Sequence, residues 1–108
     1  MRLKSGRDFA EVKQQGERLA AGCLIANWKT LPVACVSRVG VITSRKLGSA
    51  VVRSRARRLL RETFRLHQHE LIQPLDLVLV ARQSIVEKDF SGVERDFVTT
   101  LKQAGLLK

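Results

Sequence analysis

The spacing of apolar and polar positions along the chain predicts three helices. Apolar residues recur every three or four positions, which is the period of one helix face, over residues 5–15, 50–68 and 91–104. The second segment is the longest of the three and is rich in arginine. We therefore expect one long central helix between two shorter ones.

Polar and small residues at the ends of these segments support the helices. Ser5 can cap the first helix, and Gly16 suits its C-terminal end. Ser49 suits the N-cap of the central helix. Ser91 and Glu94 form a capping-box pattern at the start of the last helix.

Apolar runs without the helical period predict the strands. Residues 20–29 and 76–82 predict one strand each, and residues 33–44 predict one or two. The centre of the segment 76–82 is continuously apolar, which is typical of a strand buried on both faces. The predicted order is helix, two or three strands, long helix, strand and helix, an α+β arrangement.

The composition indicates one folded domain over residues 1–108, with 44% hydrophobic residues. No stretch approaches the roughly eighteen apolar residues of a membrane span, and no apolar signal region follows Met1, so we expect a cytoplasmic protein. We expect Cys23 and Cys35 to be buried, reduced thiols, although a disulfide between them stays possible. A zinc site is disfavoured because the sequence has no Cys-x-x-Cys pair.

The positive charge is distributed unevenly. The net charge is +10, but residues 1–69 carry fifteen Lys or Arg and four Asp or Glu, whereas residues 70–108 carry five and six. The first part of the chain therefore supplies the whole positive excess. Such a field favours an acidic polymer as the partner; general basicity that serves only solubility is the alternative.

On a helical wheel the central segment divides into an apolar side and a basic side. The side expected to pack on the sheet holds Val52, Ala56, Leu59, Leu60, Thr63 and Leu66. The basic side holds a ladder of arginines four positions apart, namely Arg53, Arg57, Arg61 and Arg65, with Arg58 beside it, Ser54 within it and Arg55 on its flank. Only Glu62 offsets the repulsion between these charges. Because guanidinium groups suit bidentate phosphate contacts, this side predicts a nucleic-acid surface, with a solvated basic face as the alternative.

Strands on both sides of the basic helix favour RNA over DNA as the partner. Helix-turn-helix modules, which read duplex DNA, are all-helical. The major groove of A-form RNA is too deep and narrow for side chains to read, so a helix that follows the phosphates of a folded RNA fits this chain better.

A longer motif resembles a known protein family. Residues 45–62 read Arg-Lys-Leu-Gly-Ser-Ala-Val-Val-Arg-Ser-Arg-Ala-Arg-Arg-Leu-Leu-Arg-Glu. This run resembles the signature of the bacterial ribonuclease P protein subunit, an Arg-Asn-Arg motif followed by two basic residues, Leu, any residue and Arg. Residues 39–46 resemble the second strand of the family and its basic end, Asp8 and Phe9 resemble its first helix, and residues 76–82 resemble the strand after the long helix.

The resemblance implies a fold and a function. The expected fold is an αβββαβα two-layer sandwich with a central mixed sheet and a left-handed βαβ crossover. The expected function is that of a ribonuclease P subunit, which binds a catalytic RNA and the 5′ leader of precursor tRNA and assists Mg²⁺-dependent removal of the leader. The RNA is the catalyst, Mg²⁺ is held mainly by the RNA and the substrate, and neither a membrane nor a protein partner is required. A structural RNA-binding protein of ribosomal type and a DNA-binding regulator are the alternative functions.

The resemblance also implies two groups of site residues. The surface for the catalytic RNA comprises Arg45, Lys46, Arg53, Ser54, Arg55, Arg57, Arg58, Arg61 and Arg65, and the leader cleft comprises Phe9, Lys13, Asn27, Arg53, Arg57 and Arg61. Ser54 stands where the family has Asn. Lys13 and Asn27 stand where other members often carry aromatic residues, so leader affinity is expected to depend on charge more than on stacking. Trp28 is expected to point to the opposite face of its strand.

The chain itself has no pattern of catalytic residues and no assigned metal ligands. Its acids Asp8, Glu11, Glu17 and Glu62 form no close sequence pair suited to two-metal hydrolysis. His67 and His69 end the central helix, where they are expected to interact with its dipole. Lys4 and Arg7 are weaker candidates for phosphate contacts.

Overall fold

The computed structural model describes residues 6–108, except for the side chains of Arg7 and Asp8. The roles predicted for Lys4, Ser5 and the Arg7 side chain therefore lie outside the described residues. Within residues 6–108, no helix is long and apolar enough to cross a membrane.

Helices and strands follow one another in the predicted αβββαβα order. They are α1 (Gly6–Gln15), β1 (Glu17–Ala21), β2 (Leu24–Thr30), β3 (Arg38–Ile42), α2 (Ala50–His67), β4 (Leu75–Ala81) and α3 (Phe90–Gln103), with the short 3-10 helices η1 (Arg45–Leu47), η2 (Gln68–Glu70) and η3 (Gln83–Glu87) in the connections. The strands form one mixed sheet in the order β1-β2-β4-β3. β2 is antiparallel to β1 and β4, whereas β3 and β4 are parallel neighbours connected through α2.

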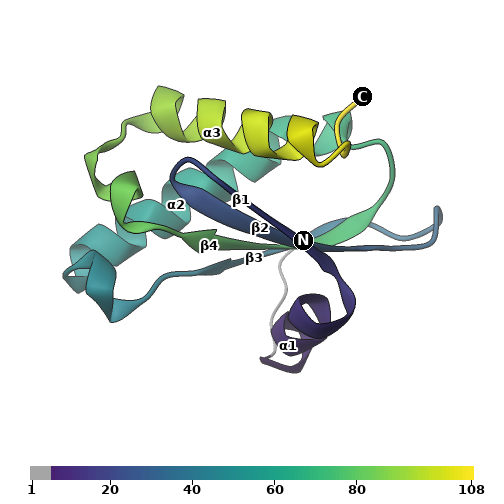
Figure 1. Cartoon of the computed structure of the whole chain (residues 1–108), viewed down its shortest axis with the longest axis horizontal. Helices are drawn as coiled ribbons and strands as arrows, with labels where there is room; N and C mark the ends of the chain where they lie inside the picture. The colour runs from purple at the N-terminus through teal and green to yellow at the C-terminus, as the bar shows by residue number, and fades with distance from the viewer. Residues whose placement is uncertain (1–5) are drawn as a thin grey trace.

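The two faces of the sheet are covered by different helices (Figure 1). α2 and α3 lie against one face, and α1 lies against the other. The alternation of side chains along β2 directs Leu24, Ala26 and Trp28 into the main core on the α2–α3 face. Val12 of α1 and Val78 of β4 form a small second cluster on the opposite face. Trp28 therefore points to the core side, away from α1, as predicted.

The central helix α2 begins where the sequence predicts and buries a slightly different stripe. Ser49 Oγ accepts a hydrogen bond from the Val52 backbone N–H at 3.4 Å, which confirms Ser49 as the N-cap. Leu66, predicted to face the sheet, is exposed, and Phe64 is buried in its place. The contact with the sheet is centred on i, i+4 steps, which leave Leu66 on the flank of the helix. The buried residues of α2 are Ala56, Leu60, Thr63 and Phe64.

The prediction of one strand over residues 20–29 is wrong, because the chain folds there into the β1–β2 hairpin. Gly22 forms the turn with a φ of 60°, a left-handed conformation that favours glycine. A Cβ atom at Gly22 would also lie 2.3 Å from the Asp96 side chain of α3. The turn therefore depends on glycine both for its backbone conformation and for its contact with α3.

Gly16 follows α1 but is required for a different reason from a helix cap. Its backbone N–H donates to the Val12 carbonyl at 2.9 Å, yet it lacks the positive φ of a left-handed cap. A Cβ atom at this position would lie 2.1 Å from the Trp28 carbonyl oxygen. Gly16 thus allows the end of α1 to approach the backbone of β2.

Two further predictions are corrected by the positions of β3 and α3. Only Arg38–Ile42 forms a strand within residues 33–44, so the run compared with the second strand of the family is the third strand here. α3 begins with Asp89 as its N-cap, whose Oδ1 accepts from the Gly92 N–H at 2.9 Å. The predicted capping box of Ser91 and Glu94 is therefore wrong, because both residues lie inside the helix.

The two cysteines differ in their surroundings. Both are free, but Cys23 is buried and Cys35 is exposed, which contradicts the expectation that both are buried. Cys35 is exposed because the residues around it form a loop and not a strand. Burial, together with the neighbouring Asp96 carboxylate, raises the pKa of the Cys23 thiol to about 12. Cys23 is therefore a protonated core residue at neutral pH.

Candidate nucleic-acid interface

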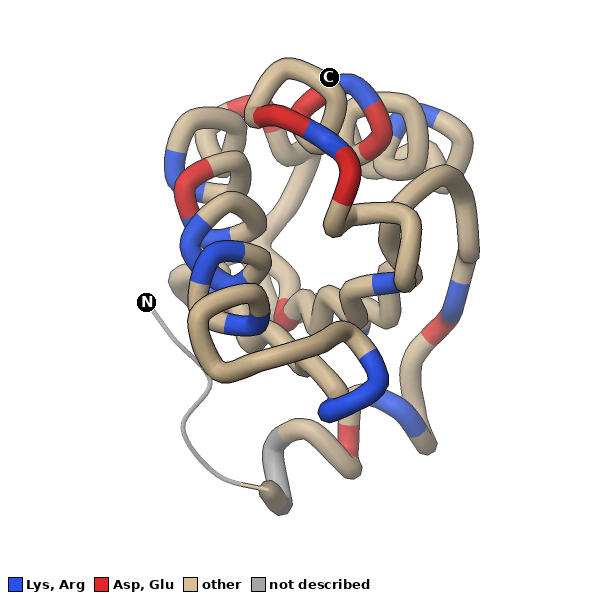
Figure 2. Tube along the Cα trace, turned by 90° about the vertical axis from the view of Figure 1, so that its left-hand side faces the viewer, with Lys and Arg blue, Asp and Glu red and all other residues tan. Residues whose placement is uncertain are grey.

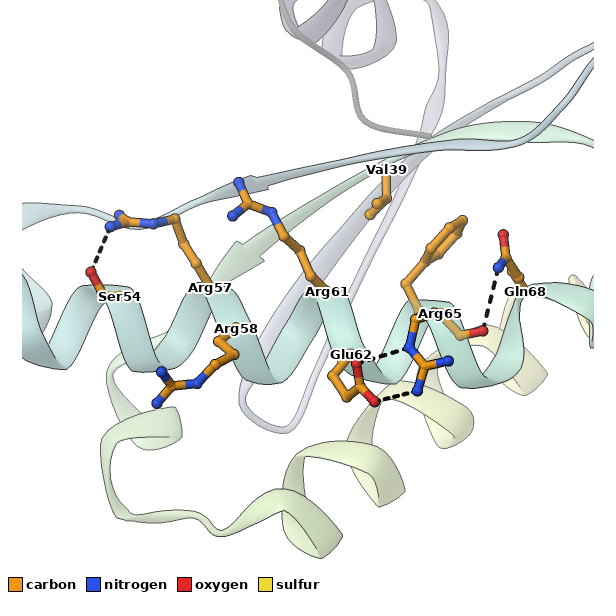
Figure 3. A pocket seen from close by; sticks show the side chains of 9 residues that line it. Val39, Ser54, Arg57, Arg58, Arg61, Glu62, Arg65 and Gln68 are labelled. Atoms are coloured by element: carbon orange, nitrogen blue, oxygen red, sulfur yellow. Dashed lines mark hydrogen bonds and ion pairs between the residues drawn. The ribbon is translucent and has the colours of Figure 1, made fainter.

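Four of the six arginines of α2 line a hollow between this helix and the edge strand β3 (Figure 3). The hollow has a volume of about 650 Å³ and is lined by Val39, Ser54, Arg57, Arg58, Arg61, Glu62, Phe64, Arg65 and Gln68. Arg57 and Arg61 extend from the helix toward β3, whereas Arg58 extends from the opposite side of α2. The surface is therefore wider than a single row of charges along the helix.

Arg57 is held in place by two neighbouring hydroxyl groups. Its two terminal nitrogens donate to Thr43 Oγ1 at 2.8 Å and to Ser54 Oγ at 3.1 Å. Arg53 makes a weaker contact, from its Nη1 to the Gly48 carbonyl at 3.4 Å. Ser54, where the family motif has Asn, thus orients the guanidinium one helical turn further on.

Two arginines of α2 have protein partners that occupy part of their guanidinium groups. Arg55 donates to the Lys88 carbonyl at 2.6 Å, which ties α2 to the segment before α3. Arg65 forms an ion pair with Glu62, in which Nε lies 3.0 Å from Oε2. The hydrogen bond from Arg65 also lowers the pKa of the Glu62 carboxyl group. The predicted ladder therefore contains arginines in several different environments.

Arg45 and Lys46 lie in η1, the short helix between β3 and α2, and both are exposed. Leu47, which follows them, is buried and anchors η1 to the core. Gly48 ends η1 with a φ of 142° and leads into the Ser49 cap. These two cations are therefore presented close to the start of the basic helix.

A second, smaller hollow lies on the α1 side of the sheet. It has a volume of about 250 Å³ and is lined by Lys13, Arg18, Ile25, Asn27 and Val80. Phe9 lies nearby as a half-buried residue packed against the cluster of Val12 and Val78. Of the residues predicted to form one leader cleft, Lys13 and Asn27 line this hollow, and Arg57 and Arg61 line the first one. Phe9 and Arg53 line neither, and the two hollows share no lining residue.

The sequence prediction missed Arg18 as a residue of this second hollow. Arg18 is opposite Asn27 in the register of the β1–β2 hairpin, so the two side chains share one face of the sheet. Recognising the turn at Gly22 would have revealed this pairing.

The two histidines after the centre of α2 differ in their contacts. His67 lies between two carboxylates, with Nδ1 2.7 Å from Glu70 Oε2 and Nε2 2.8 Å from Glu94 Oε2. Burial lowers the pKa of His67, but the hydrogen bonds with Glu94 and Glu70 outweigh it and raise the pKa above its ordinary value. His69 is exposed. Among the described residues, no group of three or more His, Cys, Asp or Glu side chains could hold a metal ion.

The distribution of charge differs between the helices (Figure 2). Lys and Arg gather along α2, whereas acidic and basic residues are mixed in α3. The fold and this charge distribution define a small basic α+β protein with one arginine-rich helical surface.

The chain belongs to the family of ribonuclease P protein components, subunits of an endoribonuclease that acts in tRNA processing and whose catalyst is RNA. A family model described as Ribonuclease P matches residues 1–105. The ribonuclease P protein component of Syntrophomonas wolfei is 36% identical over 105 residues, which cover 97% of this chain and 87% of that protein. The corresponding protein of Clostridium beijerinckii is 34% identical over 111 residues, covering 97% and 89%.

Solved structures of the same family share the fold. The RNase P protein of Staphylococcus aureus superposes with a TM-score of 0.89 at 25% identity, covering 99% of this chain and 97% of that one. The RNase P protein from Thermotoga maritima gives a TM-score of 0.83 at 27% identity, with 95% and 96% covered. The likeness therefore extends over the whole domain.

Proposed function

We propose that this chain binds the catalytic RNA of ribonuclease P through the outer surface of α2 and through η1. The observation that carries the proposal is the arginine-lined hollow between α2 and β3. We assign the predicted RNA-binding residues to this surface, with Arg57, Arg58 and Arg61 at its centre. We also propose that the chain contacts the 5′ leader of precursor tRNA and so assists its removal.

The arrangement of Arg57 supports phosphate binding of useful strength. Because Thr43 and Ser54 already hold its guanidinium, less side-chain freedom is lost when a phosphate binds. A planar guanidinium can also offer two parallel N–H groups to one phosphate. Several such contacts on one helix would displace counterions from the RNA, so binding should weaken steeply with salt.

We propose that the Mg²⁺ of ribonuclease P is not held by this chain. No suitable group of His, Cys, Asp or Glu is present in residues 6–108. We propose that Mg²⁺ is bound by the RNA and the substrate, and that the protein contributes cations that reduce phosphate repulsion between them. This role predicts that the protein matters most when Mg²⁺ is scarce.

Reconstitution with the catalytic RNA tests the proposal. The full chain should increase the rate of precursor tRNA cleavage at low Mg²⁺, and the increase should shrink as Mg²⁺ is raised. Cleavage at low Mg²⁺ that is no faster with the protein than with the RNA alone would contradict it. A precursor with an intact leader and a mature tRNA should be compared as ligands, since only the first offers the leader.

A further inference from the structure

The hollow beside α2 contains an acidic residue among its arginines. Of the nine described residues that line it, Glu62 is the only acid, and it lies beside Arg57, Arg58, Arg61 and Arg65. A carboxylate repels the phosphates that arginines attract. If the surface served only to attract an RNA, a neutral residue at position 62 would therefore give tighter binding.

Glu62 holds the guanidinium of Arg65 by one edge (Figure 3). Arg65 Nε donates to Glu62 Oε2 at 3.0 Å, and Arg65 Nη2 donates to Glu62 Oε1 at 2.5 Å. A guanidinium has five N–H donors, and this bidentate contact uses two of them. The other edge of the guanidinium, formed by Nη1 and the second N–H of Nη2, can bind a phosphate in the same bidentate way while Glu62 keeps the first edge.

Arg57 is held in a similar way on the same helix. Ser54 contacts Arg57 and Glu62 contacts Arg65 from three positions earlier in α2, which is about one helical turn. Arg57 is half-buried, whereas 63% of the Arg65 side chain is exposed. Water competes with a single neutral hydrogen bond at such an exposed position, and a bidentate, charge-assisted contact is stronger. An acid at position 62 can thus hold an arginine that a hydroxyl group would hold less well.

We propose that Glu62 is a positioning residue, which holds Arg65 so that the other edge of its guanidinium binds a phosphate of the catalytic RNA. The proposal rests on the proposed function and specifies how one arginine of that surface is prepared for binding. A long arginine side chain loses conformational freedom when it binds a ligand, and the contact with Glu62 removes part of this freedom beforehand. The repulsion between Glu62 and the RNA is smaller than this gain, because the carboxylate is 44% exposed and is screened by salt.

The direction of the change in affinity for Glu62→Ala tests the proposal. This substitution raises the net charge of the full chain by one, and charge alone would tighten binding to the catalytic RNA. We expect binding that is about threefold weaker, which corresponds to the cost of ordering one long side chain. Glu87→Ala is the matched control, because it removes an exposed acid outside the hollow, and it should not weaken binding. An affinity of Glu62→Ala equal to or above that of the wild type would overturn the proposal.

Glu62→Gln distinguishes the hydrogen bonds from the charge. It removes the same charge as Glu62→Ala but keeps one acceptor oxygen for Arg65. Its affinity for the catalytic RNA should therefore lie between those of Glu62→Ala and the wild type. Both residues favour a helix, so α2 should stay folded in both variants, and urea unfolding checks this. Equal affinities of the two folded variants would contradict a role of the contact with Arg65.

A double-mutant cycle shows whether Glu62 acts through Arg65. When Arg65→Ala has removed the guanidinium, only the repulsion by Glu62 remains, so adding Glu62→Ala should tighten binding instead of weakening it. A role of Glu62 in helix stability alone would not produce this reversal. Binding that weakens further in the double variant would exclude the positioning role. Binding and the rate increase at low Mg²⁺ are measured in parallel for the wild-type chain, which distinguishes failure of the positioning role from failure of the proposed function.

Discussion

α2 and α3 pack on the same face of the sheet and use their polar residues differently (Figure 1). Each buries one apolar stripe in the main core. α2 carries six arginines and one glutamate, whereas α3 carries two acids and two bases, Glu94, Arg95, Asp96 and Lys102. The two helices thus have similar buried faces, but their exposed faces differ in charge.

The polar residues of α3 form contacts within the protein. Asp96 accepts from the Cys23 N–H at 2.9 Å and from Lys88 Nζ at 2.8 Å, which fixes the β1–β2 turn against the helix. Glu94 reaches His67 at the end of α2. Much of the outer surface of α2, by contrast, lines an open hollow. The polar residues of α3 thus stabilise the fold, and the open surface of α2 is the one we propose for the partner.

The largest expected effect concerns the apolar core, to which both helices contribute. Phe97→Ala in α3 should lower the free energy of unfolding by about 3–5 kcal/mol and Leu60→Ala in α2 by about 2–5 kcal/mol, because both side chains are fully buried. Urea unfolding measures both changes. Val51→Ala on the exposed side of α2 is the control and should have little effect. A small loss for either buried residue would show that its helix packs loosely.

The next prediction distinguishes the role of α3 from that of α2. Asp96→Ala leaves the Cys23 N–H and Lys88 without their partner, so stability should fall by about 1–3 kcal/mol. Asp96→Asn keeps an acceptor and should lose less. Under conditions where each variant is folded, its affinity for the catalytic RNA should equal that of the wild type. Weaker RNA binding by the folded variants would show that α3 also belongs to the interface.

The sequence was sufficient to predict the helices and strands whose apolar residues follow a clear pattern. The apolar stripe and the Ser49 cap predicted α2 within a residue at either end, and the continuous apolar run predicted β4. The hairpin was missed because its two strands are joined by a two-residue turn at Gly22, which interrupts no apolar run. The reason for glycine at position 16 could not be predicted either. It becomes visible only when the fold places the backbone of Trp28 against Gly16.

The sequence predicted which residue types line the candidate site, but it did not predict how those residues are arranged in space. The basic residues of α2 follow directly from the sequence, but the contact of Arg55 with Lys88 depends on how α2 meets the segment before α3. Likewise, the pairing of Arg18 with Asn27 depends on the register of a hairpin that the pattern did not show. Contacts between distant segments are decided by tertiary packing, and the pattern of one segment carries little information about them.

A third prediction concerns the outside of α2. Arg57→Ala and Arg61→Ala should each weaken binding to the catalytic RNA and reduce the slope of log affinity against log salt by roughly 0.7–0.9, if each removes one phosphate contact. Arg95→Ala removes an exposed arginine from α3 and is the matched control, for which we expect no change in slope. Slopes that fall equally for all three variants would mean that net charge, and not the surface of α2, controls binding.

The smallest expected effect tests the contact that joins the two helices. His67 bridges Glu70 and Glu94, and its pKa is raised above the ordinary value of 6.5 in the folded protein. The folded state therefore binds a proton more tightly than the unfolded state does. This stabilisation is fully present below the unfolded pKa and is lost as the pH rises through the folded pKa.

Urea unfolding at several pH values should detect this loss. The wild-type chain should become less stable as the pH rises from slightly acidic to slightly alkaline values, and His67→Gln should remove this dependence at a cost of about 1 kcal/mol at low pH. His69→Gln is the control, because His69 is exposed and its removal should leave the dependence intact. If His69→Gln removed the dependence and His67→Gln did not, the bridge between α2 and α3 would contribute nothing to folding. The acids of α3 would then stabilise the fold only through Asp96 and the hairpin.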